Sequence, residues 1–229
     1  MPVAQNVKRI LQQMKQAALD AHRKPEDIAL LAVTKNLGWN LLQEAYEAGC
    51  RDLGESRVKE ALEKIERFPA DIRWHFIGKL QKNKIPKILG RFVLIHSVDT
   101  PELAIKISEA SVHAGMMTQI LLESNTSGEE SKEGAPPHVW IEQMEHLLEL
   151  RGISIQGMMT MAPLTEDEGM IRHCFSELRH TRDALQALAN TRADLSTLSM
   201  GMSNDFLLAI QEGSTLVRIG TALFNPSGG

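Results

Sequence analysis

Short apolar segments alternate with longer amphipathic segments along almost the whole chain. The apolar segments are rich in β-branched residues and predict eight β-strands, at residues 28–34, 51–53, 72–77, 92–97, 117–124, 153–158, 195–199 and 215–219. Between them, the spacing of apolar positions predicts seven helices, including residues 40–48, 56–67, 101–114, 137–150 and 167–189. The order strand, helix, strand is therefore repeated from residue 28 to residue 219.

One further amphipathic helix, at residues 3–21, precedes the first predicted strand. Its apolar face consists of Val7, Ile10, Leu11, Met14 and Ala18. We expect this helix, which lies within the N-terminal segment 1–25, to pack on the rest of the domain through that face.

Strands that alternate with helices favour parallel pairing through right-handed crossovers. Eight such units in 229 residues predict an α/β protein, a (β/α)8 TIM barrel with an extra N-terminal helix. An open, doubly wound sheet is the alternative architecture. No linker rich in Pro, Gly or Ser divides the chain, so we expect a single domain over residues 1–229.

Residues at the predicted helix ends support these boundaries. Ser56 is expected to be the N-cap of the helix at 56–67, and the segment 165–168 has the pattern of a capping box. Four glycines that stand just past helical segments predict left-handed C-caps: Gly49, Gly115, Gly152 and Gly213.

Composition and charge exclude several functional classes. The net charge of −4 argues against general nucleic-acid binding, which needs a basic excess. No apolar run approaches the roughly 20 residues of a membrane helix, and the N-terminal residues lack the features of a signal peptide. The two cysteines, Cys50 and Cys174, have no spacing for a metal or redox site. We therefore expect a cytoplasmic protein without a nucleic-acid or membrane partner.

Lys35 ends the first predicted strand, after the residues LLAVT. Because the C-terminal ends of the strands form the functional site of a TIM barrel, its amine is expected at the mouth of an apolar barrel. Partial desolvation there would make the amine a better nucleophile, as Schiff-base formation requires. The alternative is an ordinary lysine whose aliphatic stem lies along apolar surface.

The ends of predicted strands seven and eight carry the sequences SMGMS, at 199–203, and RIGT, at 218–221. Barrels often bind phosphate here, and Gly201 and Gly220 would let the main chain approach an anion without a Cβ in the way. Alternatively, Ser203 is only the N-cap of a helix at 204–211, and each glycine only a turn residue.

Closure of the barrel would bring these two candidates together, because strand eight pairs with strand one. An aldehyde bound at Lys35 would then have its phosphate within reach of the loops after strands seven and eight. Arg218 would face the ring between them, and a guanidinium opposite a pyridine nitrogen would discourage its protonation. The alternative for Arg218 is a structural ion pair across the mouth.

The chain also resembles a known family in a series of motifs, found in order between residues 30 and 224. The motifs are AVTK, GES, WHFIGKLQKNK, HSVD, NTSGEESKEG, GMMTMAP, LSMGMSNDF and GSTLVRIGTALF. They are similar to those of the pyridoxal phosphate homeostasis protein family, which resembles the N-terminal barrel domain of alanine racemase. The resemblance implies pyridoxal 5′-phosphate as cofactor.

The resemblance also implies roles for individual residues. Lys35 would form the Schiff base with the cofactor, and Arg218 would face the pyridine nitrogen. The residues expected around the phosphate are Ser199, Met200, Gly220 and Thr221, and those expected to line the same mouth are His75, Ser97 and Met159.

Four positions depart from the family pattern. Ser56 stands where the family usually has the asparagine of a GEN motif, and Arg57 replaces a common aromatic residue. Lys79 replaces an uncharged residue and Glu123 a common glutamine. We expect the charges of Lys79 and Glu123 to lie near the mouth, where the two side chains could pair, and we expect cofactor binding to survive these changes.

Racemisation by pyridoxal phosphate enzymes needs an acid/base group on each face of the cofactor. In alanine racemase the second group is a tyrosine from a further domain. This chain stops shortly after predicted strand eight, and its only tyrosine, Tyr46, lies in the first barrel helix. We therefore expect a carrier that holds pyridoxal phosphate in intracellular vitamin B6 and linked amino-acid homeostasis, without substantial turnover and with no catalytic residue.

Two other functions remain as alternatives. The first is a pyridoxal phosphate enzyme, such as an amino-acid racemase of weak activity. The second is a phosphosugar-binding barrel enzyme without the cofactor. The expected partners are pyridoxal phosphate and, as recipients, enzymes that require it, and the chain is expected to be a monomer.

Overall fold

The computed structural model describes residues 2–129 and 132–225. The strands are β1 (Ala29–Val33), β2 (Asp52–Glu55), β3 (Arg73–Phe76), β4 (Leu94–Val98), β5 (Thr118–Glu123), β6 (Ile153–Met159), β7 (Thr197–Ser199) and β8 (Leu216–Ile219). The α-helices are α1 (Pro2–Asp20), α2 (Trp39–Glu47), α3 (Val58–Arg67), α4 (Ile85–Ile88), α5 (Pro101–His113), α6 (Pro137–Leu148), α7 (Glu168–Ala189), α8 (Phe206–Gln211) and α9 (Thr221–Phe224). Two short 3-10 helices are η1 (Pro25–Asp27) and η2 (Lys82–Lys84).

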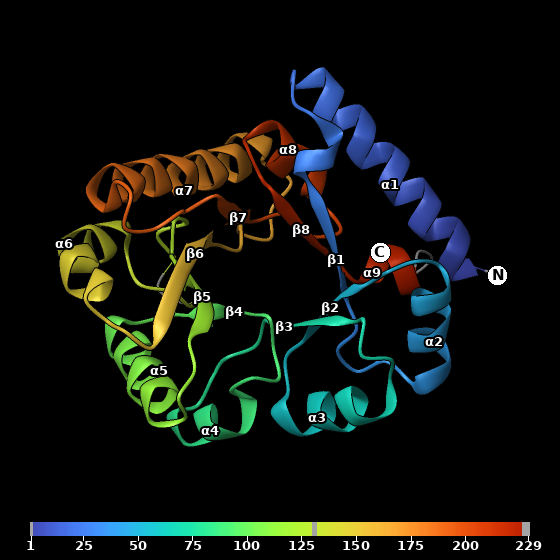
Figure 1. Cartoon of the computed structure of the whole chain (residues 1–229). Helices are drawn as coiled ribbons and strands as arrows, with labels where there is room; N and C mark the ends of the chain where they lie inside the picture. The colour runs from blue at the N-terminus through green and yellow to red at the C-terminus, as the bar shows by residue number, and fades with distance from the viewer. Residues whose placement is uncertain (1, 130–131, 226–229) are drawn as a thin grey trace.

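The eight strands form a closed barrel in which every neighbouring pair is parallel, in the order β1 to β8. β8 returns to pair with β1, with Leu31 opposite Arg218. Helices surround the strands on the outside (Figure 1). The predicted TIM barrel is therefore confirmed, and the open doubly wound sheet is wrong. Closure places the first and last strands side by side, which the functional site requires.

Helix α1 packs on the outside of the barrel against α2, α8 and α9 (Figure 1). Val7, Ile10 and Met14 are buried, as predicted for the apolar face of this helix. Leu11 was predicted on the same face but is 47% exposed, so that part of the prediction is wrong. Polar contacts add to the packing, because Asn6 donates a hydrogen bond to the carbonyl of Leu223 in α9. The N-terminal helix thus covers the seam where the barrel closes.

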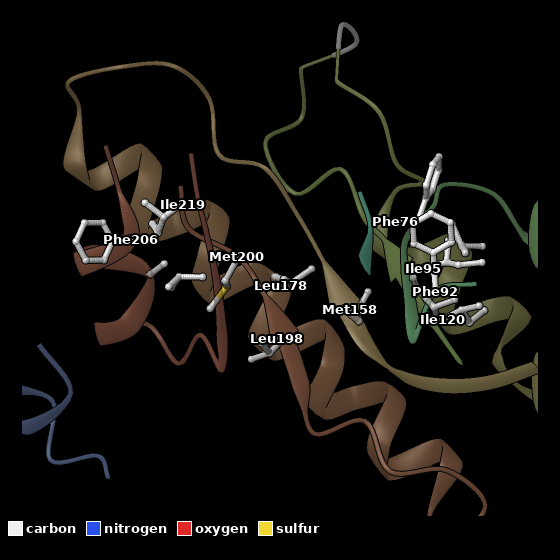
Figure 2. Packing of buried hydrophobic residues seen from close by; sticks show 14 of the residues in the cluster. Phe76, Phe92, Ile95, Ile120, Met158, Leu178, Leu198, Met200, Phe206 and Ile219 are labelled. Carbon is white, nitrogen blue, oxygen red and sulfur yellow. The ribbon is translucent and has the colours of Figure 1, made fainter. Parts of the chain in front are cut away.

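The main hydrophobic core lies between the outer faces of the strands and the surrounding helices. Figure 2 shows part of it, with Met158 and Leu198 from the strands and Leu178 and Phe206 from the helices. A second, smaller apolar cluster is separate from this core and consists of Leu94, Leu121 and Met159, with Met161 packed against it. Since successive strand residues point to opposite faces, this cluster occupies the barrel interior.

Two predicted helix caps are wrong. Helix α3 begins at Val58 and its N-cap is Arg57, without a side-chain hydrogen bond, so Ser56 does not cap it. The segment before α7 is not a capping box, because the carboxylate of Asp167 accepts the amides of Gly169 and Met170. The side chain of Asp167 takes the place of the Thr165–Glu168 pair, because its carboxylate oxygen lies within hydrogen-bond distance of the amides of the first turn.

The predicted glycine C-caps are confirmed at Gly49, Gly115 and Gly213, where φ is +94°, +67° and +111°. Gly152 is different, since it is not among the residues with positive φ. A Cβ at Gly152 would lie 2.1 Å from the carbonyl oxygen of Ser108, so this glycine permits a close approach of β6 and α5. The prediction of a left-handed cap at Gly152 is therefore wrong.

The described part of the chain has neither a membrane-spanning helix nor a cluster of metal-binding side chains. Across residues 2–129 and 132–225, no helix is both long enough and apolar enough to cross a bilayer. Within the same ranges, no three His, Cys, Asp or Glu side chains are grouped as a metal site would require. Both cysteines are buried free thiols.

Candidate functional site

A cavity of about 490 Å³ opens at the C-terminal ends of the strands. Its walls come from the residues after β1, the segment Met161–Leu164 after β6, the segment Met202–Asp205 after β7, and the start of α9. Lys35, Arg218, Gly220 and Thr221 all line it, together with Lys132. Its volume is within the usual range of small-molecule sites. The structure thus brings four of the predicted site residues to one cavity.

Lys35 lies two residues after the end of β1 and lines this cavity. Its side chain is exposed, so the predicted partial desolvation of the amine is wrong. The exposure follows from the chain path, because the next residue, Asn36, has a φ of +62° and the backbone leaves the barrel there. An exposed amine is freely accessible to an aldehyde from solvent.

The backbone before Lys35 is fixed by a buried ion pair behind the strand. Lys64 of α3 donates hydrogen bonds to the carbonyl of Thr34, at 2.8 Å, and to a carboxylate oxygen of Glu55, at 2.7 Å. The Thr34 hydroxyl donates to the same Glu55 oxygen at 2.6 Å. Lys64 and Glu55 are 5% and 0% exposed, so α3 holds the end of β1 through a desolvated contact.

Four backbone amides of residues that line the cavity are available to an anion. Within the described ranges, the amides of Ser203, Asn204, Gly220 and Thr221 donate to neither a backbone nor a side-chain acceptor. Gly201, with a φ of +96°, makes the turn that leads to them, and a Cβ there would lie 2.6 Å from Cβ of Ala209. Unpaired amides that converge on a cavity form a binding site for phosphate.

Side-chain contacts join the two segments that carry these amides, at residues 202–205 and 220–221, which we call the cradle. The Ser203 hydroxyl accepts a hydrogen bond from the amide of Ala222 in α9, at 3.2 Å. The carboxylate of Asp205 accepts the amide of Met202 at 2.5 Å. Helix α8 begins at Phe206 after Asp205, so the alternative in which Ser203 caps this helix is wrong.

Arg218 of β8 lines the same cavity and is 5% exposed. Its guanidinium donates to the carbonyl and hydroxyl oxygens of Ser199, at 2.6 and 2.7 Å, and to the carbonyl of Thr160, at 2.8 Å. It forms no salt bridge with any described residue, so the predicted ion-pair alternative is wrong. Burial lowers the pKa of Arg218 to about 10, against the opposing charges of Glu123 and Asp205.

Glu123 places a second buried titratable group at the end of β5 and is 4% exposed. Burial raises the pKa of Glu123 to about 7, and the positive charge of Arg218 opposes the shift. Glu123 does not pair with Lys79, as the sequence suggested, because Lys79 forms its salt bridge with Glu133 at 2.8 Å. The departure at Glu123 therefore leaves a carboxyl group that titrates near neutral pH.

The other predicted site residues lie deeper than the cavity wall. Ser97 donates to the carbonyl of Gly78, Met159 belongs to the apolar cluster inside the barrel, and Met200 is buried in the main core. His75 lies inside the barrel, where it contacts His96. Their roles as cofactor contacts remain predictions.

Several site residues were not predicted from the sequence. They include Asn204 in the cradle, Thr160 as a partner of Arg218, the segment 162–164, and Lys132. Thr160 directly follows β6, so its position at a strand end was the available sequence feature. Lys132 lies in a loop after β5 that no strand or helix pattern places over the mouth.

A second cavity, of about 500 Å³, lies between α3 and η2 and is lined by Ser56, Arg57 and Lys79 among others. It contains neither Lys35 nor the cradle. Three of the four departures from the family pattern thus lie away from the candidate site, and only Glu123 faces Arg218.

Comparisons with known proteins agree with this geometry. The family model for the alanine racemase N-terminal domain matches residues 4–227. The pyridoxal phosphate homeostasis protein of Aquifex aeolicus is 40% identical over 225 residues, which cover 98% of this chain and 98% of the relative. The protein of the same name from Pseudomonas aeruginosa is 37% identical over 97% of this chain and 94% of its own length. The chain belongs to the pyridoxal phosphate homeostasis protein family.

Solved structures of the family have the same architecture. A protein of unknown function from Bifidobacterium adolescentis is 39% identical, with a TM-score of 0.91 over 97% of this chain and 94% of that one. PipY of Synechococcus elongatus, solved with PLP bound, is 34% identical, with a TM-score of 0.80 over 93% of this chain and 100% of that one. Alanine racemase of Clostridium difficile shares only the fold, at 17% identity and a TM-score of 0.77.

Proposed function

We propose that this protein binds pyridoxal 5′-phosphate at the barrel mouth, as a Schiff base on Lys35, and acts in intracellular vitamin B6 and linked amino-acid homeostasis without substantial turnover. The observation that carries the proposal is the shared cavity, which is lined both by an accessible lysine amine and by residues with unpaired amides. The bound form of PipY and the names of the relatives support the same ligand.

Each part of the cavity suits one part of this ligand. The amides of Ser203, Asn204, Gly220 and Thr221 would hold the phosphate, and Lys35 would take the aldehyde. Arg218 is a buried cation that lines the same cavity and is held by Ser199 and Thr160. When bound, the cofactor supplies a reversible imine and a ring that withdraws electrons. A cation beside the pyridine nitrogen keeps the nitrogen unprotonated, which weakens that withdrawal and favours storage over turnover.

Tyr46 also supports a carrier over a racemase. It is the only tyrosine of the sequence, and its hydroxyl contacts the carboxylate of Asp71 at 3.1 Å, in the loop before β3. This loop lies at the N-terminal ends of the strands, opposite the cavity. No tyrosine of this chain can therefore act as a second acid/base at the cofactor.

The test is a titration of the purified full-length protein with pyridoxal phosphate, followed by borohydride reduction and peptide mapping. We expect the protein to turn yellow and the reduced label to lie on Lys35. Lys35→Ala should abolish the absorbance, whereas Lys132→Ala, which changes the other lysine of the cavity, should retain it. A label on Lys132, or a protein that stays colourless, would contradict the proposal.

Turnover is tested separately with the loaded protein. We expect interconversion of L- and D-alanine no faster than with free pyridoxal phosphate. A rate well above the free cofactor that is lost in Lys35→Ala would instead establish the weak racemase.

The proposal extends to the setting of the protein. We propose a cytoplasmic, monomeric, single-domain protein over residues 1–229 that delivers its ligand to apo-enzymes requiring pyridoxal phosphate. The two buried free thiols fit a reducing compartment. Size-exclusion chromatography with light scattering tests the monomer.

A further inference from the structure

A continuous series of hydrogen bonds crosses the barrel interior beneath the candidate site. His75 Nε2 contacts the carboxylate of Asp52 at 3.1 Å, and His75 Nδ1 lies 2.9 Å from His96 Nε2. His96 Nδ1 lies 2.9 Å from Ser199 Oγ, which accepts from Arg218 at 2.7 Å. We call these five residues the interior relay.

The relay joins the two ends of the barrel. Asp52 is the first residue of β2 and lies at the N-terminal ends of the strands, which we call the lower rim. Arg218 lines the cavity at the mouth, at the C-terminal ends. The contact between His96 of β4 and Ser199 of β7 must cross the interior, because β5 and β6 separate these strands in the sheet. None of this is visible in the sequence, where the five residues are spread over more than 160 positions.

The carboxylate of Asp52 and the neutral state of the two rings fix the direction of every hydrogen bond. Asp52 has only acceptors when ionised, so His75 carries its proton on Nε2 and donates to it. His75 Nδ1 is then an acceptor, so His96 carries its proton on Nε2 and donates to it. The remaining His96 Nδ1 accepts the hydrogen of Ser199 Oγ, which itself accepts from Arg218. With both rings neutral, all donors point from the mouth to the lower rim.

The electrostatic environment favours this arrangement. Burial lowers the pKa of His96 well below its ordinary value, and the nearby charges of His75 and Arg218 lower it further. Burial opposes ionisation of Asp52, but hydrogen bonds from His75 and Arg73 outweigh it and lower the pKa of Asp52 to about 2. The charged groups that face the relay are Arg73 at the lower rim and Glu123 and Asp205 around Arg218.

We propose that His75 and His96 are positioning residues that hold Arg218 against the ligand through Ser199, and that the relay makes ligand affinity depend on the protonation of His96. This inference rests on the proposed function, since the ligand at the mouth is pyridoxal phosphate. A proton taken up from solvent on His96 Nδ1 would make this nitrogen a donor to Ser199, while His96 Nε2 still donates to His75. The Ser199 hydroxyl would lose its acceptor, and the cationic His96 would lie near Arg218.

The first test needs no ligand. Long-range proton–nitrogen spectra of the cofactor-free, full-length protein labelled at histidine report which ring nitrogen carries the proton. At pH 7.5 we expect both His75 and His96 to be neutral and protonated on Nε2. Ser199→Ala removes the hydroxyl that donates to His96 Nδ1, so the resonance of this nitrogen should shift to the position of a nitrogen that accepts no hydrogen bond. Ser111→Ala removes another buried serine hydroxyl, outside the relay, and should leave both rings unchanged.

Two results of this test would overturn the relay. The first is a His96 ring that carries its proton on Nδ1 at pH 7.5, because the bond direction would then be reversed. The second is a His96 spectrum that does not respond to Ser199→Ala.

The second test measures the affinity for pyridoxal phosphate as a function of pH. Loss of one hydrogen bond to a charged group weakens binding by about tenfold, so Ser199→Ala should bind about tenfold more weakly than the wild type at pH 8. The ratio should fall towards one on acidification, because protonation of His96 disables the relay in the wild type. Ser199→Thr keeps the hydroxyl and should restore most of the affinity.

The two proposals fail in different ways. A ratio that is constant with pH, or no rescue by threonine, would show that Ser199 has only a structural role and would overturn the pH coupling. Absence of binding by the wild-type protein would overturn the proposed function instead, and the ring spectra would still decide whether the relay has the proposed direction.

Discussion

Glu123 is a buried residue at the end of β5 whose carboxyl group changes its charge near neutral pH. Burial raises the pKa of Glu123 from 4.5 to about 7, so the folded state binds a proton there more tightly than the unfolded chain does. Such a group contributes stability that is fully present below pH 4.5 and is lost as the pH rises through 7. The carboxylate therefore destabilises the fold at alkaline pH.

Replacement of this carboxyl by an amide of the same shape should remove that loss. We expect Glu123→Gln to be more stable than the wild type by about 2–3 kcal/mol at pH 8.5, with little difference at pH 4. Urea denaturation at the two pH values measures the effect. Glu142→Gln changes an exposed glutamate on α6 and should alter stability at neither pH. An equal gain at pH 4 and pH 8.5 would show that packing, and not ionisation, causes the change.

At the scale of elements, α3 is joined to β1 and β2 by the buried pair of Lys64 and Glu55. Removal of one partner leaves an uncompensated buried charge, so Lys64→Met should lower the free energy of unfolding by about 3–5 kcal/mol. Lys64 also holds the carbonyl of Thr34, so the variant should react more slowly with pyridoxal phosphate through Lys35. Denaturation and stopped-flow absorbance measure the two effects.

The exposed Lys59 of the same helix provides the matched control. Lys59→Met should change neither quantity. If Lys64→Met is destabilised but reacts at the wild-type rate, the buried pair stabilises the fold without orienting Lys35.

The elements were the most predictable part of this protein. A strand buried on both faces appears as a run of apolar residues, and each of the eight runs is a strand of the barrel. The ends were less predictable, because Ser56, Thr165 and Gly152 each satisfy a local rule for a helix cap that the folded chain does not use. Caps depend on which oxygen reaches an amide, and that depends on the path of the folded backbone.

The site was predictable only where it follows directly from strand order. Lys35, Arg218, Gly220 and Thr221 stand at the ends of neighbouring strands, and closure of the barrel is enough to bring them together. The contact of His96 with Ser199 depends instead on side chains that cross the interior from strands that are not neighbours. Sequence spacing contains no information on such a contact.

At the scale of the whole molecule, the candidate site straddles the seam where the chain closes on itself. Lys35 follows β1, and the cradle follows β7 and β8. Helix α1 covers the same seam from outside, through Asn6 and Arg9, which donate to carbonyls of α9 (Figure 1). The first and last parts of the sequence therefore build both the closure and the site.

A ligand bound at both sides of this seam should act as a clamp on the barrel. At a free concentration of 100 times its Kd, pyridoxal phosphate should add about 2.7 kcal/mol to the free energy of unfolding. Hydrogen exchange should slow most at the amides of β1 and β8. Pyridoxal without the phosphate can react with Lys35 but cannot occupy the cradle, and Lys35→Ala keeps the cradle but loses the imine, so neither should give the full protection. Equal protection by pyridoxal would mean that the unpaired amides of Gly220 and Thr221 do not hold the phosphate, because only a ligand anchored on both strands can oppose their separation.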